Sequence, residues 1–425
     1  MKVLLVGQGA REHAIADALK RSKNLSALFA YMEMPNPGIC RLAEHWKIGK
    51  LNDLEALKQY AMFVEPDLVI FGPETPLAVG AVDELEGRGF KCVGPRKKLA
   101  LLEADKSFMR EFLSKYFKKG YPKWQIFTSV EDLRQRIISD NRIVLKPVGL
   151  TGGKGVKVFG KQLLTLDEAL DYAKLVLEKD GKILVEEKVE GEEFSLMVFT
   201  DGQKIIPMPL VQDYKYAYDG DVGPMTGGMG SFSQADHALP FVSQQMFEEA
   251  LDLLNETIHK LLEQFGVPYK GILYGQFMQT EQGPKVIEFN VRFGDPEAMN
   301  VLAVLKSDLL DILASIANGD LVSQVEFDAK ATVCKYLVPK GYPEQPLVGY
   351  EFELPERELE MLGIKVYLAS VVEKNGVFVT TSSRSVALLK VADNPVEGKK
   401  IIDECLAKYC PSGLFYRKDI PRVSL

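Results

Sequence analysis

The stretch Val286-Ile287-Glu288-Phe289-Asn290-Val291-Arg292-Phe293-Gly294-Asp295-Pro296-Glu297 begins with the alternation of a β-strand. Because strand side chains point to opposite faces in turn, the pattern places Val286, Glu288 and Asn290 on one face and Ile287 on the other, apolar face. Glu288 and Asn290 then present two oxygen ligands side by side, an arrangement that suits a hard cation such as Mg²⁺. A half-buried strand before a charged loop is the alternative, but it does not account for this pair followed so closely by three more charged residues.

The composition is that of a soluble globular protein. Its 425 residues suggest about three domains, and 46% hydrophobic with 26% charged residues is ordinary. The net charge of -7 disfavours a surface for polyanions, so we expect no nucleic-acid partner. The apolar run after Lys2 is too short for a signal peptide and no membrane-spanning run follows, so we expect a cytoplasmic protein without a membrane partner.

Sulfur and imidazole chemistry has no support in the sequence. The four histidines are scattered, which disfavours a zinc site. The cysteines are odd in number and mostly far apart, so we interpret them as reduced thiols; they are Cys40, Cys92, Cys334, Cys405 and Cys410.

Residues 1–104 show the pattern of a parallel, Rossmann-like α/β domain. Near-continuous apolar runs alternate with helical stretches, which indicates a buried parallel sheet; the runs are 2–6, 27–31, 67–71 and 90–93. Each run ends in a turn rich in glycine or proline, such as Gly7-Gln8-Gly9 and Gly72-Pro73-Glu74. Ligands of open α/β sheets bind at such carboxyl-end loops, so we expect a ligand there.

The rest of the chain predicts mixed structure in two further domains, 105–325 and 326–425. In the first we expect helices at 106–117, 243–264 and 306–318, strands at 142–147 and 182–187, and a hairpin over 271–291. Short strands near 331–337, 364–372 and 376–380, with a final helix near 396–409, indicate a small C-terminal domain that is mainly β. The fold class is therefore multidomain, with α/β and α+β parts.

A glycine-rich loop follows the predicted strand 142–147, in Lys146-Pro147-Val148-Gly149-Leu150-Thr151-Gly152-Gly153-Lys154-Gly155. Its glycines leave backbone N–H groups free to approach phosphate oxygens, and its lysines supply point charges. It is not a Walker A loop, because the order Gly-x-x-x-x-Gly-Lys-Ser/Thr is absent. A flexible hairpin turn with incidental lysines is the alternative.

The acidic segment Glu186-Glu187-Lys188-Val189-Glu190-Gly191-Glu192-Glu193 joins two predicted strands. A hinge of this kind offers backbone donors and acceptors to an adenine edge, and a carboxylate after it can accept from ribose hydroxyls. Taken alone, the segment is equally a solvated acidic turn. It becomes specific only between the lysine–glycine loop before it and the Glu288 strand after it.

The order of lysine–glycine loop, acidic hinge and Glu-x-Asn strand resembles the ATP-grasp fold. Within that fold, four blocks resemble the glycinamide ribonucleotide synthetase family, in the same order over essentially the full length. The blocks are Gly9-Ala10-Arg11-Glu12-His13, residues 72–77, Gln212-Asp213 with residues 219–230, and residues 288–297. The resemblance implies ATP-dependent ligation of glycine to 5-phosphoribosylamine through glycyl phosphate, with Mg²⁺ or Mn²⁺, in purine biosynthesis.

The resemblance also implies roles for single residues, with a lid subdomain at about 120–190. The implied ATP contacts are Lys106, Lys146, Gly149, Gly152, Gly153, Lys154, Gly155, Glu186, Val189 and Glu193, of which Glu186 and Val189 meet adenine and Glu193 meets ribose. The implied metal ligands are Gln276, Glu288 and Asn290, and the implied catalytic residues are Lys146, Asp213 and Arg292.

Residues 213–230 are predicted as a substrate loop. They contain five glycines, one proline and three aspartates, and compact domains rarely keep such long structureless loops without a use. A flexible linker is the alternative. The implied substrate contacts are Gly9, Arg11, Glu74, Asp213, Lys215, Gly228, Arg292, Asp295 and Glu297.

The predicted hairpin supports Gln276 as a metal ligand independently of the resemblance. A three-residue turn, Glu281-Gln282-Gly283, with glycine in the left-handed position, sets Gln276 opposite Glu288. A slip of one residue undoes this pairing.

Two other functions remain open on the sequence. Another ATP-grasp ligase or a carboxylase would keep Lys146, Glu288 and Asn290, but not the 219–230 block. A nicotinamide-dependent oxidoreductase would use the loop at Gly7, but position 12 is Glu where its third glycine belongs.

Three positions depart from the resembled family. Met225 stands where Asn is common, Tyr216 where a basic residue is common, and Ser382-Ser383 where two glycines are common. The resemblance therefore does not predict the ligand contacts at these three positions. We expect a monomer or a weak homo-oligomer.

Overall fold

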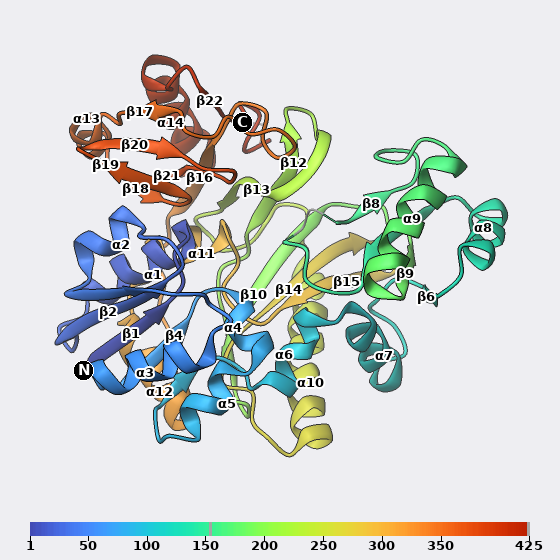
Figure 1. Cartoon of the computed structure of the whole chain (residues 1–425), viewed down its shortest axis with the longest axis horizontal. Helices are drawn as coiled ribbons and strands as arrows, with labels where there is room; N and C mark the ends of the chain where they lie inside the picture. Colours follow the sequence, from blue (N-terminus) through green and yellow to red (C-terminus); the bar gives the residue numbers. More distant parts are fainter. Residues whose placement is uncertain (153–154, 423–425) are drawn as a thin grey trace.

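The computed structural model describes residues 1–152 and 155–422, and its elements are arranged as Figure 1 shows. Gly153 and Lys154, two of the predicted ATP contacts, lie outside the described residues. Within the described residues the strands form five sheets. No helix in this part of the chain is long and apolar enough to cross a membrane.

The first sheet is parallel and confirms the α/β pattern of the N-terminal region. Its order is β3-β2-β1-β4-β5, with β1 at Lys2–Val6, β2 at Ala27–Met32, β3 at His45–Ile48, β4 at Leu68–Phe71 and β5 at Cys92–Val93. The helices are α1 (Ala10–Lys20), α2 (Pro37–Leu42), α3 (Leu54–Val64), α4 (Glu74–Val79), α5 (Ala81–Glu86) and α6 (Lys97–Ala104). Strand order reverses between β1 and β4, so the segments after these two strands border one crevice.

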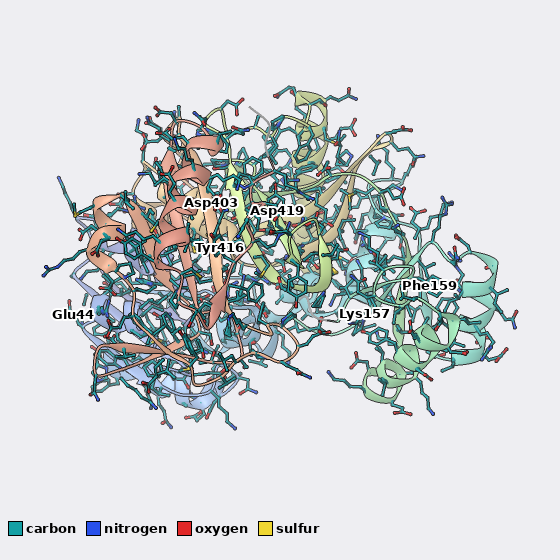
Figure 2. The ribbon with its side chains drawn as sticks, turned by 90° about the horizontal axis from the view of Figure 1, so that it is seen from above. Glu44, Lys157, Phe159, Asp403, Tyr416 and Asp419 are labelled. Atoms are coloured by element: carbon teal, nitrogen blue, oxygen red, sulfur yellow. The ribbon has the colours of Figure 1, made fainter. Side chains whose placement is uncertain are left out.

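A small antiparallel sheet, which we call the lid sheet, stands out from the body of the molecule, where Lys157 and Phe159 mark it in Figure 2. Its order is β6-β9-β7-β8, with β6 at Trp124–Phe127, β7 at Ile143–Pro147, β8 at Lys157–Val158 and β9 at Ile183–Glu187. Helices α8 (Val130–Ser139) and α9 (Leu166–Asp180) give it an apolar core of its own. Helix α7 (Lys106–Tyr116) precedes it along the chain.

The next sheet contains the predicted hairpin. Its order is β11-β10-β14-β15, with β10 at Glu193–Thr200, β11 at Ile205–Pro207, β14 at Gly271–Thr280 and β15 at Gly283–Asn290. Helix α10 (Gln244–Phe265) packs on β14 and β15, and α11 (Glu297–Ala303) and α12 (Leu309–Asn318) follow. The hairpin and the long helix before it are confirmed, because both follow clear apolar periodicity.

The C-terminal region contributes strands to two sheets. The larger has the order β12-β13-β16-β21-β18, with β22 beside β16. Its bounds are β12 Gln212–Tyr218, β13 Val222–Ser233, β16 Ala331–Pro339, β18 Ile364–Leu368, β21 Val386–Ala392 and β22 Leu414–Phe415. The smaller is β17 (Glu351–Phe352), β20 (Val377–Thr380) and β19 (Val371–Lys374), with α13 (Glu356–Met361) and α14 (Pro395–Tyr409) alongside. The predicted strand 364–372 is therefore two strands in different sheets.

The prediction that residues 213–230 form a loop is wrong. They lie in the β12–β13 hairpin, and β13 pairs with β16, so the hairpin belongs to the sheet of the C-terminal region. Alternating tyrosines at 214, 216 and 218 favour a strand. The high glycine content concealed this signal, because glycine is usually depleted in strands.

Candidate active site

Most of the residues predicted for the site line one cleft of about 730 Å³. Its walls are the segments that follow β1 and β4, the lid sheet, β15 and the β12–β13 hairpin. Predicted residues in these walls are Arg11, Glu74, Lys106, Lys146, Gly152, Glu186, Val189, Glu193, Asp213, Lys215, Glu288, Asn290, Arg292, Asp295 and Glu297. The predicted residues that are described but do not line the cleft are Gly9, Gly149, Gly155, Gln276 and Gly228.

The predicted pairing of Gln276 with Glu288 is confirmed, but it arises in a different way. The turn between the strands contains two residues, Glu281 and Gln282, where three were predicted. That register alone would set Gln276 opposite Ile287. A bulge at Ile287 shifts the pairing by one residue, so that Gln276 lies opposite Glu288.

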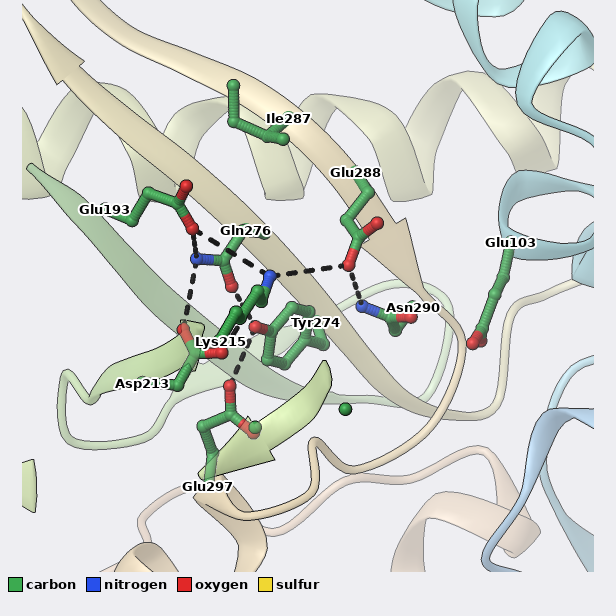
Figure 3. A network of polar contacts seen from close by, with 12 residues as sticks. Glu103, Glu193, Asp213, Lys215, Tyr274, Gln276, Ile287, Glu288, Asn290 and Glu297 are labelled. Atoms are coloured by element: carbon green, nitrogen blue, oxygen red, sulfur yellow. Dashed lines mark hydrogen bonds and ion pairs between the residues drawn. The ribbon is translucent and has the colours of Figure 1, made fainter. Parts of the chain in front are cut away.

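The same bulge makes the predicted alternation of β15 wrong at two positions. Val286 is fully buried in the core, and Ile287 lines the cleft beside Glu288 (Figure 3). A bulge turns successive side chains toward one face, so strict period-two alternation fails where it occurs. The cleft therefore has an apolar wall at Ile287 directly before its carboxylate.

Arg110, which was not predicted for the site, stabilises this bulge. Its side chain is fully buried, and its two Nη atoms donate to the carbonyls of Val286 at 2.9 Å and Ile287 at 2.8 Å. Its Nε donates to Glu186 at 2.5 Å, so one guanidinium joins α7, β9 and β15. A charged residue on the buried face of α7 was the signal that could have identified it.

Arg110→Met is expected to lower the midpoint of thermal unfolding. The variant leaves Glu186 with one cationic partner fewer and removes the donors of two carbonyls. Breaking a buried ion pair costs about 3–5 kcal/mol. Calorimetry of this variant checks the expectation, with Arg357→Met, which is exposed on α13, as the matched control. Arg110→Lys, which keeps the charge, is expected to recover part of the loss; an unchanged midpoint in Arg110→Met would contradict the assigned role.

Lys146 and Lys106 bring two ammonium groups to the side of the cleft predicted for phosphates. Lys146 is buried, with Nζ 2.7 Å from Glu186 Oε2. Lys106 Nζ donates to the carbonyl of Gly149 at 2.8 Å, and burial lowers the pKa of Lys106. Arg110 and Lys146 both contact the Glu186 carboxylate, so two buried cations neutralise it within the protein.

Lys215 lies at the centre of a carboxylate cluster, as Figure 3 shows. Its Nζ is 3.8 Å from Asp213, 3.9 Å from Glu193 and 3.7 Å from Glu288. Burial acts to lower the pKa of Lys215, but these carboxylates raise it above its usual value. Burial acts to raise the pKa of Glu288, but Lys215 and neighbouring lysines lower it to about 2. One cation therefore neutralises carboxylates from β10, β12 and β15.

Gln276 is fully buried next to this cluster. Its Nε2 donates to Glu193 at 3.0 Å and to Asp213 at 3.3 Å. The hydroxyl of Tyr274 contacts Gln276 Oε1 and lies 2.8 Å from Glu297 Oε1. Burial, followed by the charge of Asp213, raises the pKa of Glu297 to about 7. Of the three predicted metal ligands, Glu288 and Asn290 therefore face the cleft, whereas Gln276 already has partners inside the protein.

Arg292 lies between the carboxylates of Glu103 and Glu74. Its Nη2 donates to Glu103 at 2.7 Å and to Asn290 Oδ1 at 3.0 Å, and its Nε lies 3.4 Å from Glu74. Among the described residues, this buried Nε has no hydrogen-bond partner. Burial acts to lower the pKa of Arg292, and the carboxylates raise it. Glu103 was not predicted, although it is a buried charge on α6.

The N-terminal region contributes Arg11 to the opposite wall. Arg11 Nε donates to Glu12 at 2.6 Å, and its Nη1 donates to the carbonyl of Phe293 at 3.2 Å. Glu12 also accepts from the N–H of Gly9 at 2.5 Å. Gly9 therefore orients Arg11 through Glu12, and Arg11 connects α1 to the segment after β15.

The C-terminal region reaches the site through Arg384, another residue that was not predicted. Its Nη1 donates to the carbonyls of Gly227 at 2.8 Å and Gly228 at 3.0 Å, and its Nη2 lies 3.0 Å from Asp295. Asp295 also accepts from Tyr336 at 2.5 Å. Gly228 has φ +112, and a Cβ there would approach Pro296 to 2.7 Å, so this close approach requires glycine. The arginine that follows Ser382-Ser383 was the available signal.

Tyr216, one of the departures from the resembled family, contacts the lid. Lys161 Nζ lies 3.4 Å from the Tyr216 hydroxyl and 4.9 Å from its ring centre. Met225, the other departure in this hairpin, pairs with Tyr216 and lines the cleft. The hairpin and the lid therefore meet across the mouth of the cleft.

Comparison with known proteins finds one family along nearly the whole chain. Models of phosphoribosylglycinamide synthetase match as its N domain over residues 1–103, its ATP-grasp (A) domain over 104–298 and its C domain over 332–422. The phosphoribosylamine–glycine ligase of Methanocaldococcus jannaschii is 47% identical, covering 100% of this chain and 97% of that protein.

Two solved structures show the same architecture. The phosphoribosylamine–glycine ligase of Thermotoga maritima has a TM-score of 0.80 at 26% identity, covering 99% of this chain and 100% of that chain. The biotin carboxylase domain of the Hydrogenobacter thermophilus 2-oxoglutarate carboxylase, solved with MgADP and bicarbonate, has a TM-score of 0.71 at 16% identity, covering 97% and 91%. At that identity the second likeness extends to the fold alone.

Proposed function

The chain belongs to the phosphoribosylglycinamide synthetase family, and from this premise we propose which of its residues carry the reaction. It is an ATP-dependent ligase of purine biosynthesis that joins glycine to 5-phosphoribosylamine. The products are glycinamide ribonucleotide, ADP and phosphate.

The proposed reaction has two steps. The carboxylate of glycine attacks the γ-phosphate of ATP, which gives glycyl phosphate and releases ADP. The amine of phosphoribosylamine then attacks the glycyl carbonyl and loses a proton, and phosphate leaves as the carbon–nitrogen bond forms. Phosphoryl transfer of this kind depends on positioning and charge neutralisation. This requirement explains why the cleft contains lysines, arginines and carboxylates.

We assign the nucleotide to the side of the cleft between the lid sheet and β15. Lys106 and Lys146 are the groups for its phosphates, with the loop from Gly149 to Gly155 as cover. The main chain from Glu186 to Val189 and the apolar side chain of Ile287 suit the adenine, and the Glu193 carboxylate suits the ribose hydroxyls. The support is that side chains of these types line the same cleft.

The residues at the proposed metal site fit a hard divalent cation. Glu288 and Asn290 supply a carboxylate and an amide oxygen, and Mg²⁺ is commonly bound by one or two carboxylates together with substrate phosphates. The described residues contain no group of three or more His, Cys, Asp or Glu suited to a metal ion, which agrees with a site that the nucleotide completes. The Lys215 ammonium, 3.7 Å from Glu288, shows that a positive charge is accommodated there. When bound, Mg²⁺ or Mn²⁺ would neutralise phosphate charge, with Gln276 as the third proposed ligand.

We assign the acyl-transfer centre to the space among Arg292, Asp213, Lys215 and Glu297. Arg292 Nε, which lies 3.4 Å from Glu74 but makes no hydrogen bond among the described residues, suits an oxygen of the acyl phosphate, where it would stabilise developing negative charge. Asp213 and Glu297 suit the ammonium of glycine, and Lys215 suits an anionic group of either substrate. Substrate contacts from Gly9, Arg11, Glu74, Gly228 and Asp295 remain part of this proposal, the last two through the contacts of Arg384.

The observation that carries the assignment is the convergence of Lys146, Glu288 and Arg292 on one cleft with the 213–230 hairpin. A carboxylase or another ATP-grasp ligase would share the fold but lack the 219–230 block. A nicotinamide-dependent oxidoreductase is excluded, because the relatives of this chain are ligases. The test is ADP release with glycine and freshly made phosphoribosylamine, each omitted in turn. We expect release only with both substrates; release that ignores them would contradict the assignment.

The pH dependence of glycine binding follows from Glu297. Its pKa is raised to about 7, so the carboxyl is neutral at lower pH and negatively charged at higher pH. An ammonium group binds the charged form better, so KM for glycine is expected to fall as pH rises from about 6 to 8. Glu297→Gln is expected to remove this dependence and to raise KM for glycine about tenfold. Steady-state kinetics across this range checks it, with the exposed Glu178→Gln as control; an unaltered profile in Glu297→Gln would exclude the role.

We propose an N-terminal substrate domain at 1–104, an ATP-grasp domain at 105–325 with its lid at about 120–190, and a C-terminal domain at 326–425. We also propose that the protein acts in the cytoplasm as a monomer or weak homo-oligomer, on small molecules and without nucleic acid. The free state of its cysteines supports a reducing compartment.

A further inference from the structure

Residues 416–422, which we call the tail segment, lie against the β12–β13 hairpin. Figure 2 shows Asp419 of this segment beside the hairpin strands. The hairpin carries Asp213 and Lys215, whereas the tail segment follows β22 at the far end of the chain. This contact therefore connects the end of the chain to the proposed substrate groups.

Arg417 makes the central contacts. Its side chain is 1% exposed, and its Nη1 donates to the carbonyl of Tyr216 at 3.0 Å and to Asp221 at 2.9 Å. Its Nε and Nη2 donate to Asp419 at 2.8 Å and 2.7 Å, a bidentate pair that fixes the guanidinium plane. The guanidinium also lies 5.3 Å from the ring centre of Tyr214. Arg417 thus contacts both residues that flank Lys215.

The surrounding contacts join the same two segments. Asp419 accepts from the N–H of Gly220 at 2.9 Å, and Asp219 accepts from the N–H of Lys418 at 2.9 Å. The N–H of Arg422 donates to the Tyr214 hydroxyl at 3.0 Å, and its side chain pairs with Asp221. Two aspartates of the hairpin turn therefore bind the tail segment.

Strand pairing alone does not fix Lys215. The ladder between β12 and β13 is regular up to Tyr214 and Gly230 and resumes at Tyr216 and Met225. Residues 226–229 of β13 therefore stand opposite Lys215 alone, and the Lys215 carbonyl accepts from the Thr226 hydroxyl at 2.8 Å in place of a ladder hydrogen bond. The contacts of Arg417 with Tyr214 and Tyr216 hold the residues on either side of Lys215 from outside the hairpin.

We propose that Arg417 is a positioning residue for the ligation step, acting through Tyr214 and Tyr216 to orient Lys215. The inference rests on the proposed assignment of Lys215 to the substrate site. Arg417 contacts the main chain of β12 and is not itself proposed to contact substrate.

Arg417→Met tests the proposal, with the exposed neighbour Lys418→Met as matched control. We expect kcat/KM for glycine and phosphoribosylamine to fall about 10²-fold, as small misplacements in a site do, with KM for ATP changed less than about twofold. Arg417→Lys, which can reach one carboxylate, is expected to restore part of the activity. Normal kinetics in Arg417→Met would overturn the proposal, as would an equal loss of ATP binding and thermal stability, which would mark a merely structural role.

A double-mutant cycle with Lys215→Met separates this inference from the proposed function. If Arg417 acts through Lys215, Arg417→Met adds less than about twofold to the defect of Lys215→Met. Independent, additive losses would overturn the positioning role. Normal activity in Lys215→Met alone would instead remove the assignment of Lys215 itself, a different result from normal activity in Arg417→Met.

Discussion

Glu288→Gln is expected to lower kcat by about 10³-fold while the fold is kept, because it removes an electrostatic group from the reacting centre. Glu288 is the only carboxylate among the proposed metal ligands, and glutamine has the same shape without the charge. The low pKa of Glu288, about 2, means that the native group is fully ionised at neutral pH. The substitution also removes one of the carboxylates around Lys215, 3.7 Å away.

Two measurements check the Glu288 expectation. ADP release at saturating substrates gives kcat, and Mn²⁺ binding to the ADP complex, followed by electron paramagnetic resonance, reports the metal without turnover. The exposed Glu281→Gln, in the turn of the same hairpin, is the matched control. Near-normal turnover together with native Mn²⁺ affinity in Glu288→Gln would remove the metal assignment.

Arg292→Met is expected to lower kcat by about 10²- to 10³-fold, because it removes a preorganised cation from the acyl-transfer centre. The loss also leaves Glu103 and Glu74 without their shared partner, so some stability is lost as well. Arg292→Lys separates the two effects. It keeps a charge near the carboxylates, but it lacks the planar guanidinium, whose Nη2 contacts Glu103 and Asn290 while its Nε lies 3.4 Å from Glu74.

Kinetics with thermal unfolding distinguishes the outcomes for Arg292. Arg292→Lys is expected to unfold near the native midpoint with kcat still lowered about 10²-fold. The exposed Arg142→Lys is the matched control. A native kcat in Arg292→Lys would show that charge alone is sufficient and that Arg292 Nε has no part in the reaction.

Periodicity and turn chemistry were sufficient for most of the fold. The apolar runs at 2–6 and 67–71 form adjacent parallel strands, and the hairpin at 271–290 forms where its alternation predicts it. Two of the misses have separate causes. Glycines concealed β12 and β13, and β21 is an apolar run without alternation, which by itself does not distinguish a buried strand from a buried helix.

The site residues were predictable in part. Those within specific blocks, such as Glu288 and Arg292, lie in the cleft together. Arg110, Glu103, Arg384 and Arg417 escaped prediction because each acts through partners far away in the chain. Arg110, for example, contacts Glu186 and the carbonyls of Val286 and Ile287, and no local pattern contains those pairs.

The order of residues alone specified the chemistry available to this chain: lysines beside glycines, an acidic hinge, and a carboxylate–amide pair on one strand, because these depend on neighbours along the backbone. Only the tertiary structure determined their mutual positions. The bulge at Ile287 and the attachment of the tail segment to the β12–β13 hairpin depend on buried guanidinium groups that satisfy carbonyls and carboxylates from remote segments. A buried polar group must be hydrogen-bonded within the protein because water no longer reaches it. These contacts therefore depend on how remote segments pack and not on the local sequence.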